Sequence, residues 1–259
     1  MTSSTTIAIF NHKGGVGKTT TTVNLAADIA HIHKKRVLVI DLDPQANATR
    51  ALLGRELESG KNSIRTVLIN SIGLDATLLD TNISGLRLAP ADLSLSEAEF
   101  RLMSTLNREC ILRDALRACQ SHFDFVFVDC PPSLGLLSLN ALAAADKVLV
   151  PCETQFLSLR GLRYVLDMLA LVREKLNPRL KLLGVVATKF YILSKANNES
   201  LACLKDLQDV HLMNTVIGRD IRAEEAPSHG LPLILYAPDS RSSLQYLKLA
   251  EEVLELCRG

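Results

Sequence analysis

The residues with the clearest capacity for chemistry lie in the decapeptide Asn-His-Lys-Gly-Gly-Val-Gly-Lys-Thr-Thr at positions 11–20. This stretch follows a short apolar run at 7–10 and precedes a segment, 20–33, with the pattern of a helix. A strand, a glycine-rich turn and a helix in this order surround a phosphate group with successive backbone N–H groups. The glycines that let the backbone approach without a Cβ in the way are Gly14, Gly15 and Gly17. The pattern predicts a phosphate-binding loop, and the expected ligand is ATP.

Two side chains of this loop have defined tasks in nucleotide chemistry. Lys18 supplies a positive charge for the β- and γ-phosphates, and the hydroxyl of Thr19 can ligate Mg²⁺. His12 stands where the ordinary phosphate-loop pattern has glycine, and a second lysine, Lys13, lies at the loop entrance. In an arbitrary loop, such a lysine would be interpreted as a solvated surface charge. The contacts that the motif itself predicts are Gly14, Gly15, Val16, Gly17, Lys18, Thr19 and Thr20.

A first pair of carboxylates follows the apolar run at 37–40, in the sequence Asp-Leu-Asp-Pro-Gln. Side chains alternate along a strand, so Asp41 and Asp43 share a face and can point at one place. That geometry suits a metal or a water molecule beside the phosphates. The alternative is that the two aspartates only cap the loop after the strand, as aspartate before proline often does.

Another carboxylate, Asp129, closes the apolar run at 123–128. An aspartate at the end of an apolar strand is typical of the Walker B arrangement, which holds Mg²⁺ directly or through water. The neighbouring Cys130 is expected to be a packed apolar residue, because nothing in the sequence marks it as a thiol of lowered pKa.

The elements that must position these residues alternate between short apolar strands and helices. Such β-type runs, buried on both faces, belong to a parallel sheet covered by helices, with the ligand at the carboxyl ends of the strands. We therefore expect an α/β fold of the P-loop NTPase type, a doubly wound, mostly parallel sheet with helices on both faces. We assign no element between about 53 and 86. The further predicted strands are 37–40, 123–128, 147–150 and 182–186, and the further predicted helices are 95–117, 136–144, 158–175, 197–207 and 240–257.

Composition narrows the class of protein. No linker or repeat divides the 259 residues, so we expect one domain over 1–259. The 29 basic and 28 acidic residues nearly cancel, so binding to nucleic acid requires a local patch.

The six cysteines include no C-x-x-C pair, which favours free thiols in a reducing cytosol. Residues 1–6 are polar and the apolar stretch at 134–145 is short, so neither a signal peptide nor a membrane span is expected.

The loop K-G-G-V-G-K-T-T, the run D-L-D-P-Q and the run D-C-P-P-S-L-G together resemble the ParA/MinD family of deviant Walker-type ATPases. The similarity is greatest to the small, chromosomal-type ParA (Soj-like) partition ATPases. Further segments that resemble this family are 88–93, 150–153, 224–230 and 236–241.

This resemblance implies roles for individual residues. Lys13 would reach across a dimer to the nucleotide of the other subunit, and would act with Lys18 in catalysis. Asp43 would orient or activate the attacking water, while Asp41 would lie near Mg²⁺. The adenine pocket would form around Gly218, Arg219, Pro238 and Asp239. The chain departs from the family at His12, where glutamine is frequent, and at Gly218, where proline is usual.

The resemblance also implies a function. ATP would drive homodimerisation, and the dimer would bind double-stranded DNA without sequence preference through Lys195, Arg219 and Arg222. Hydrolysis, stimulated by a ParB-like adaptor protein, would release the DNA. The protein would then be cytoplasmic, associated with the nucleoid, and would partition chromosome or plasmid cargo.

Alternatives change the cargo or the location. The same ATPase could position chemoreceptor arrays or microcompartments, because cargo choice resides in the adaptor. A cell-division switch of the MinD type needs a basic amphipathic helix at the membrane. Here the helix expected at 244–257 is acidic on its polar side, so no stable membrane insertion is expected. An iron–sulfur carrier is disfavoured by the lack of paired cysteines.

Overall fold

The computed structural model describes residues 4–58, 62–70, 72–154, 158–207 and 210–258. Its centre is a seven-stranded sheet with the order β3-β4-β2-β5-β1-β6-β7. Neighbouring strands are parallel, except for the antiparallel pair of β3 and β4 at one edge. The strands are β1 (Thr5–Ile9), β2 (Val37–Asp41), β3 (Leu79–Asp80), β4 (Leu86–Ala89), β5 (Phe125–Asp129), β6 (Lys147–Glu153) and β7 (Lys181–Thr188).

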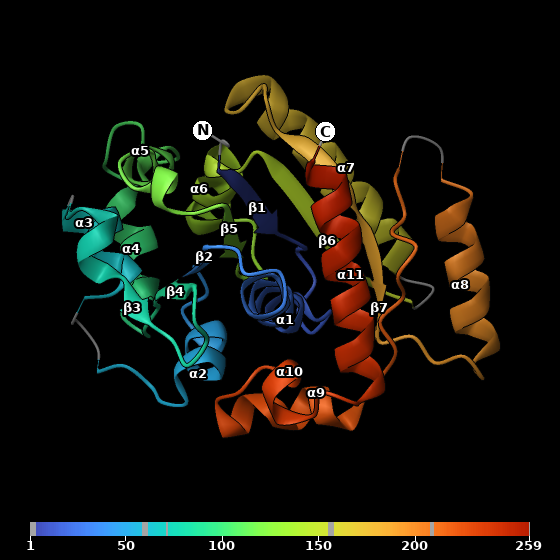
Figure 1. The fold of residues 1–259 in the computed structure, drawn as a ribbon. Coiled ribbons are helices and arrows are strands. Elements are labelled where there is room, and N and C mark those ends of the chain that lie inside the picture. Colours follow the sequence, from blue (N-terminus) through green and yellow to red (C-terminus); the bar gives the residue numbers. More distant parts are fainter. Residues whose placement is uncertain (1–3, 59–61, 71, 155–157, 208–209, 259) are drawn as a thin grey trace.

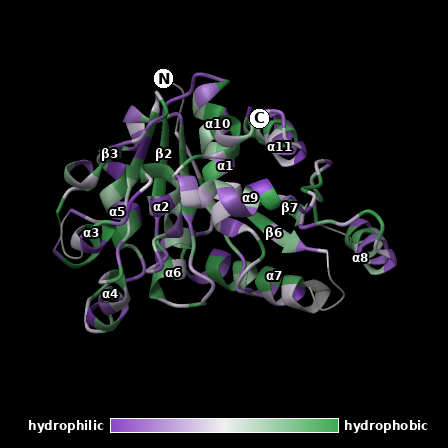
Figure 2. Ribbon diagram, turned by 90° about the horizontal axis from the view of Figure 1, so that it is seen from below, coloured by the Kyte–Doolittle hydropathy of each residue, from purple (hydrophilic) through white to green (hydrophobic). Residues whose placement is uncertain are grey.

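Helices cover both faces of the sheet (Figures 1 and 2). One face packs against α1 (Lys18–His31), α2 (Asn47–Leu53), α10 (Leu233–Tyr236) and α11 (Arg241–Cys257). The other packs against α3 (Ile64–Asn70), α4 (Leu95–Leu102), α5 (Ile111–Arg117), α6 (Leu136–Ala144) and α7 (Ser158–Lys175). Two further helices are α8 (Lys195–Lys205), beyond the β7 edge, and α9 (Ile221–Glu225), below the sheet in Figure 1. Short 3₁₀ turns span Leu74–Thr77, Gln120–His122 and Ala226–His229.

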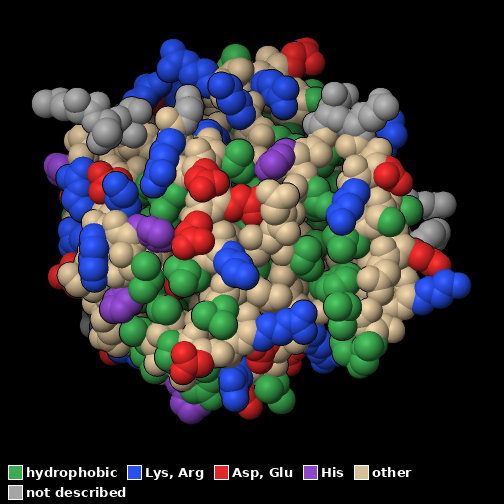
Figure 3. All heavy atoms as spheres, turned by 45° about the vertical axis from the view of Figure 1, so that its right-hand side comes forward, with side chains coloured by type: hydrophobic (Ala, Val, Ile, Leu, Met, Phe, Trp, Pro, Cys, Tyr) green, Lys and Arg blue, Asp and Glu red, His purple; other side chains and the backbone are tan. Residues whose placement is uncertain are grey.

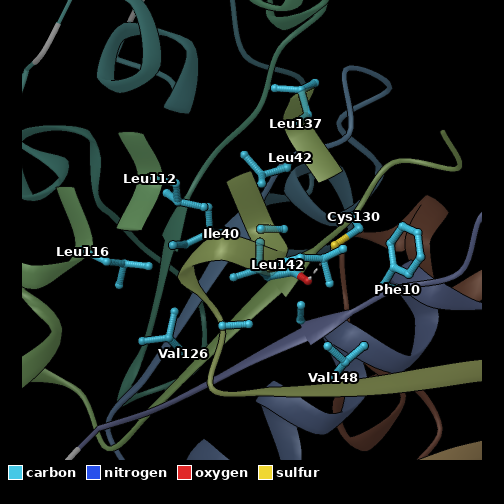
Figure 4. Packing of buried hydrophobic residues seen from close by; sticks show 14 of the residues in the cluster. Phe10, Ile40, Leu42, Leu112, Leu116, Val126, Cys130, Leu137, Leu142 and Val148 are labelled. Atoms are coloured by element: carbon cyan, nitrogen blue, oxygen red, sulfur yellow. Dashed lines mark hydrogen bonds between the residues drawn. The ribbon is translucent and has the colours of Figure 1, made fainter. Parts of the chain in front are cut away.

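Alternation along the strands divides the core into two layers. In β2, Val37 and Val39 join the layer under α1 and α11, whereas Leu38 and Ile40 face the opposite helices. All four side chains are fully buried, as expected for a parallel sheet with helices on both sides. Figure 4 shows the second layer, where side chains from the strands meet leucines of α5 and α6.

The order of the strands creates the crevice that a ligand needs. Strand β1 lies between β5 and β6. The chain that leaves β1 first forms the half of the sheet that contains β2, β3, β4 and β5, and it later forms the other half, β6 and β7. In open α/β sheets, ligands bind outside the carboxyl ends of the strands at such a switch point. The loop at 11–17 lies at this position, directly after β1.

The predicted fold class is confirmed, and the five predicted strands are present. The predicted helix 95–117 is wrong, because α4 ends at Leu102 and α5 begins at Ile111. Between them Asn107 has a left-handed backbone with a φ of 54°. The hydroxyl of Ser104 donates to the carbonyl of Arg101, which offers the backbone an alternative to the helix. The segment at 53–86 contains the short α3 and β3, for which no pattern was evident.

The C-terminal helix is where it was expected. Ser240 caps α11 by accepting a hydrogen bond from the backbone N–H of Ser243. The buried side of α11 includes Tyr246, Leu249 and Val253, which belong to the core layer shared with α1. None of the helices in the described part of the chain has the length and apolar character that a membrane crossing requires.

Candidate nucleotide-binding site

The loop between β1 and α1 has the backbone of a phosphate cradle. Gly15 and Gly17 have positive φ angles, 74° and 88°, which residues with a Cβ rarely adopt. Helix α1 begins at Lys18, and its N-cap, Gly17, supplies no side-chain hydrogen bond. The first N–H groups of a helix have no partner within the helix, and they carry the positive end of its dipole. This end of α1 can therefore receive an anion.

Internal hydrogen bonds hold the loop in place. The Asn11 side chain donates to the carbonyl of Pro151 at 2.8 Å and accepts from the N–H of Lys13 at 3.0 Å. The Lys18 ammonium donates to the carbonyl of Lys13 at 3.0 Å. Burial lowers the pKa of Lys18, and the negative charge of Asp129 acts in the opposite direction. Lys18 thus lies inside the loop, close to the acidic end of β5.

Asp129 lies at the carboxyl end of β5 and is fully buried. It accepts hydrogen bonds from the hydroxyls of Thr19, at 2.7 Å, and Thr22, at 2.8 Å. Burial raises the pKa of the Asp129 carboxyl to about 6, while the two threonine hydroxyls lower it. The contact between Thr19 and Asp129 joins two of the three residues predicted for the Mg²⁺ site, the third being Asp41.

A hydroxyl and a carboxylate form a hard oxygen donor set that fits Mg²⁺, which usually keeps water and phosphate oxygens as its other ligands. Among the residues described, no group of three or more His, Cys, Asp or Glu side chains is arranged for a metal. The donors present therefore fit a cation that is shared with a phosphate ligand. They do not form a cage made entirely of protein side chains.

Asp41 engages both of its carboxylate oxygens with protein donors. One oxygen accepts from the N–H of Asp43 at 3.0 Å, and the other accepts from the N–H and the hydroxyl of Thr49, each at 2.8 Å. Burial, reinforced by the charge of Asp129, raises its pKa to about 7. Asp41 thus caps the loop after β2, as the alternative interpretation of the sequence predicted. Its position near Mg²⁺ stays a prediction.

Asp43 differs from Asp41 because its side chain lines the cavity. It is 8% exposed, and one oxygen accepts from the N–H of Gln45 at 2.9 Å. Its negative charge raises the pKa of Asp129 and also acts on the pKa of Lys18. The three charged groups therefore belong to one electrostatic cluster.

The cavity at this site has a volume of about 660 Å³, within the range of small-molecule sites. It extends from the phosphate loop between α2 and the segment at 217–232. The lining away from the phosphate loop includes Val23, Asn24, Asn47, Arg50, Ala51, Ile217, Gly218, Arg219, Pro227, Pro232 and Tyr246. Away from the phosphate loop, the cavity lining thus mixes apolar residues with polar and charged ones, among them Asp220, Glu224 and Ser228.

The predicted base-side residues divide into two groups. Gly218 and Arg219 line the cavity, whereas the described residues Pro238 and Asp239 are not part of its lining. The N–H of Gly218 donates to the Gln245 side chain at 2.9 Å. Sequence reasoning missed Gln245, because the contact joins a loop to a helix and no motif marks it. It also missed Pro227 and Pro232, although the turn at 224–230 was noted as similar to the family.

Lys13 has a partner within its own chain. Its ammonium lies 2.9 Å from a carboxylate oxygen of Glu153, the last residue of β6. The Lys13 side chain is 39% exposed, so it remains accessible at the surface of the loop. His12, the preceding residue, lies edge-on against the ring of Tyr164 in α7, with the ring centres 5.1 Å apart.

The three predicted DNA contacts are exposed. Lys195 is the first residue of α8, and Arg219 lies 3.8 Å from Glu224. Arg222 is in α9. A hollow of about 420 Å³ brings Arg219 together with Lys189 and with Ser194, which precedes Lys195. Figure 3 shows basic side chains on this side mixed with acidic ones, so any attraction for DNA is local.

Cys130 is packed as expected. It is 1% exposed, and in Figure 4 its sulfur lies among apolar side chains of the core. Burial and the charge of Asp129 raise the pKa of its thiol, which suppresses the reactive thiolate. The other cysteines are also free, and Cys203 is exposed on α8.

Comparisons with known proteins agree with this geometry. A family model described as an AAA domain matches residues 4–182, a range that includes the phosphate loop and both acidic strand ends. The sporulation initiation inhibitor protein Soj of Bacillus subtilis is 42% identical over 250 residues, which cover 95% of this chain and 97% of that protein. The chromosome partitioning protein ParA of Myxococcus xanthus is 39% identical over 249 residues, covering 96% and 87%.

A similar solved structure is that of cobyrinic acid a,c-diamide synthase from Mycobacterium smegmatis with a bound ATP analog and magnesium. Its TM-score is 0.86 and its sequence identity is 32%. The match covers 99% of this chain and 96% of that one. The likeness in fold therefore extends over almost the entire chain.

Proposed function

The chain belongs to the ParA family of partition ATPases, and from this premise we propose that it is an ATP-dependent switch that dimerises, binds DNA and positions a cargo. The cargo is chromosome or plasmid DNA. The observation that carries the proposal is the convergence of Lys18, Asp43 and the Thr19–Asp129 pair at one cavity. These are the groups that phosphoryl transfer to water requires.

Each group has a task in the proposed hydrolysis of ATP. The N–H groups of the loop and the ammonium of Lys18 bind the phosphates. Asp43 accepts a hydrogen bond from the attacking water and so directs it toward the γ-phosphorus. Thr19 and Asp129 would hold Mg²⁺, which would neutralise charge on the phosphates, and Asp41, whose pKa is raised in part by the charge of Asp129, would lie near the ion.

Dimerisation supplies the link between ATP and DNA. Lys13 reaches the phosphates of the partner subunit, so two chains associate only when nucleotide is bound. The dimer carries twice the number of Lys195, Arg219 and Arg222 side chains. Because the net charge of the single chain is only +1, attraction to DNA would come from these local basic groups and not from bulk charge. A ParB-like adaptor stimulates hydrolysis and returns the protein to monomers at the nucleoid.

The arrangement of α11 supports a DNA-directed role over a membrane-directed one. An amphipathic helix that lies on a membrane inserts its apolar face between lipids. The apolar face of α11 is instead buried in the core layer shared with α1. We therefore propose that nucleotide controls DNA binding by the basic side chains near the cavity, and that α11 does not act as a membrane anchor.

DNA binding measured with and without ATP tests the proposal. We expect affinity for random double-stranded DNA with ATP and weak binding with ADP. If about four phosphates are neutralised, a fourfold increase in salt weakens binding about a hundredfold. Lys195→Glu, at an exposed side chain outside the cavity lining, is expected to impair DNA binding while ATP-dependent dimerisation, followed by size-exclusion chromatography with light scattering, persists. Equal affinity for DNA in the presence and absence of ATP would refute the switch.

A further inference from the structure

A buried hydrogen bond connects the phosphate loop to a strand far away in the sequence. The hydroxyl of Thr188, the last residue of β7, donates to the carbonyl of Val16 at 2.8 Å. Both residues are buried, with 2% and 1% of their surfaces exposed. A buried carbonyl without a hydrogen-bond donor lowers the stability of the folded state. The Thr188 hydroxyl provides this donor to the Val16 carbonyl at a position shielded from water.

The carbonyl that Thr188 engages controls the direction of an N–H group in the phosphate cradle. In a trans peptide, the carbonyl of Val16 and the N–H of Gly17 lie in one plane and point in opposite directions. Fixing the carbonyl toward Thr188 therefore fixes the N–H of Gly17 toward the other side. Gly17 lines the cavity and is the N-cap of α1, with a φ of 88°.

We infer that Thr188 is a positioning residue for phosphate binding: its hydroxyl fixes the Val16–Gly17 peptide so that the Gly17 N–H is aimed at the nucleotide. The inference rests on nucleotide binding at this loop, which is also the premise of the proposed function. It does not depend on DNA or on an adaptor.

The end of β7 also holds the other wall of the cavity. Two residues after Thr188, the N–H of Phe190 donates to the carbonyl of Ile217, and the carbonyl of Phe190 accepts from the N–H of Arg219. Lys189, between them, has a left-handed backbone with a φ of 51°. One short segment, 188–190, thus sets both the phosphate loop and the base-side segment. Thr188 links the positions of the two walls between which the nucleotide lies.

Calorimetric titration of nucleotide with Mg²⁺ into the full chain tests this assignment. Thr188→Val keeps the shape of the side chain and removes the donor, and we expect it to bind ATP and ADP about tenfold more weakly. Thr188→Ser restores the hydroxyl and is expected to bind as the unchanged protein does. The matched control is Thr77→Val, because the Thr77 hydroxyl donates to the carbonyl of Leu74 at 2.8 Å in an equally buried position remote from the site.

The outcomes separate this inference from the proposed function. If Thr188→Val binds nucleotide as tightly as the unchanged protein, or if Thr77→Val weakens binding equally, the positioning role is overturned. Weak binding by Thr188→Ser overturns it as well, because the hydroxyl would then not be responsible. If Thr188→Val does not fold, Thr188→Ala is measured in its place, and failure of both to fold assigns the hydroxyl to folding and also overturns the inference. An unchanged protein that binds no nucleotide would instead refute the proposed function.

Discussion

The two ends of the nucleotide cavity are built in different ways. At the phosphate end, buried side chains on strand ends and in α1 satisfy one another, as in the Thr19–Asp129–Thr22 cluster. At the base end, the walls are loops and short helices, and Arg219 is an exposed side chain whose ion pair with Glu224 spans 3.8 Å. Buried, mutually satisfied groups fix geometry more strictly than exposed ion pairs. We therefore expect catalysis to depend on the first region, and we expect the second region to tolerate more variation.

Replacement of Asp43 tests the catalytic part of this comparison and is expected to have the largest effect. Asp43→Ala removes the proposed acceptor for the attacking water, which slows hydrolysis by about 10²–10⁴-fold. Binding of ATP is retained, because Lys18 and the backbone of the loop are unchanged. The variant is expected to accumulate as an ATP-bound dimer in size-exclusion chromatography with light scattering. Turnover at the rate of the unchanged protein would remove Asp43 from the mechanism.

Sequence reasoning succeeded where local chemistry defines the structure. The phosphate loop and Asp129 could be placed from the sequence, because each follows an apolar strand and carries a recognisable motif. The break at Asn107 was missed, because helical periodicity continues on both sides of the turn. The contact of Gln245 with Gly218 was also missed, since it depends on where α11 packs. Motifs thus predict the phosphate end, whereas tertiary packing determines the base end.

A carboxylate within α1 shows what happens when a buried charge lacks the partners of the phosphate end. Asp28 is 1% exposed, one of its oxygens has no hydrogen-bond partner in the structure, and burial raises its pKa to about 7. Its value in an unfolded chain is near 3.8. The folded state therefore retains a proton that the unfolded state releases, and stability is lost as the pH rises from about 4 to about 7.

Asp28→Asn is expected to remove this pH dependence. Between pH 5 and pH 8, the unchanged protein should lose about 2–3 kcal/mol more of its free energy of unfolding than the variant. Urea denaturation at the two pH values measures the difference, and contributions from other carboxylates such as Asp41 cancel between the two proteins. Parallel losses in both proteins would show that Asp28 is already charged in the folded state.

The two lysines of the loop distinguish binding within one chain from binding across a dimer. Lys18→Ala is expected to weaken nucleotide binding about ten- to a hundredfold, because a charged donor to phosphate is lost. Lys13→Ala is expected to keep nucleotide affinity and to lose the ATP-dependent dimer. Calorimetry measures the first property and light scattering the second. Equal losses of affinity in the two variants would make Lys13 an ordinary loop residue.

Glu153 provides the finest test, because the effect of its replacement is small and its direction is diagnostic. In the single chain its carboxylate attracts the Lys13 ammonium at 2.9 Å. If Lys13 acts across the dimer, this ion pair competes with the phosphates of the partner subunit. An ion pair with partly exposed side chains is worth up to about 1 kcal/mol, so Glu153→Gln is expected to strengthen the ATP-dependent dimer about threefold.

The same substitution has a predicted salt dependence. Screening weakens exposed ion pairs, so the gain in dimer affinity should shrink as salt is raised. Lys13→Ala combined with Glu153→Gln serves as the control, because without the Lys13 ammonium the Glu153 carboxylate can no longer compete with the phosphates for it. A double variant that dimerises as poorly as Lys13→Ala alone supports the competition. Weaker dimerisation of Glu153→Gln than of the unchanged protein would mean that Glu153 orients Lys13 toward the partner instead of retaining it.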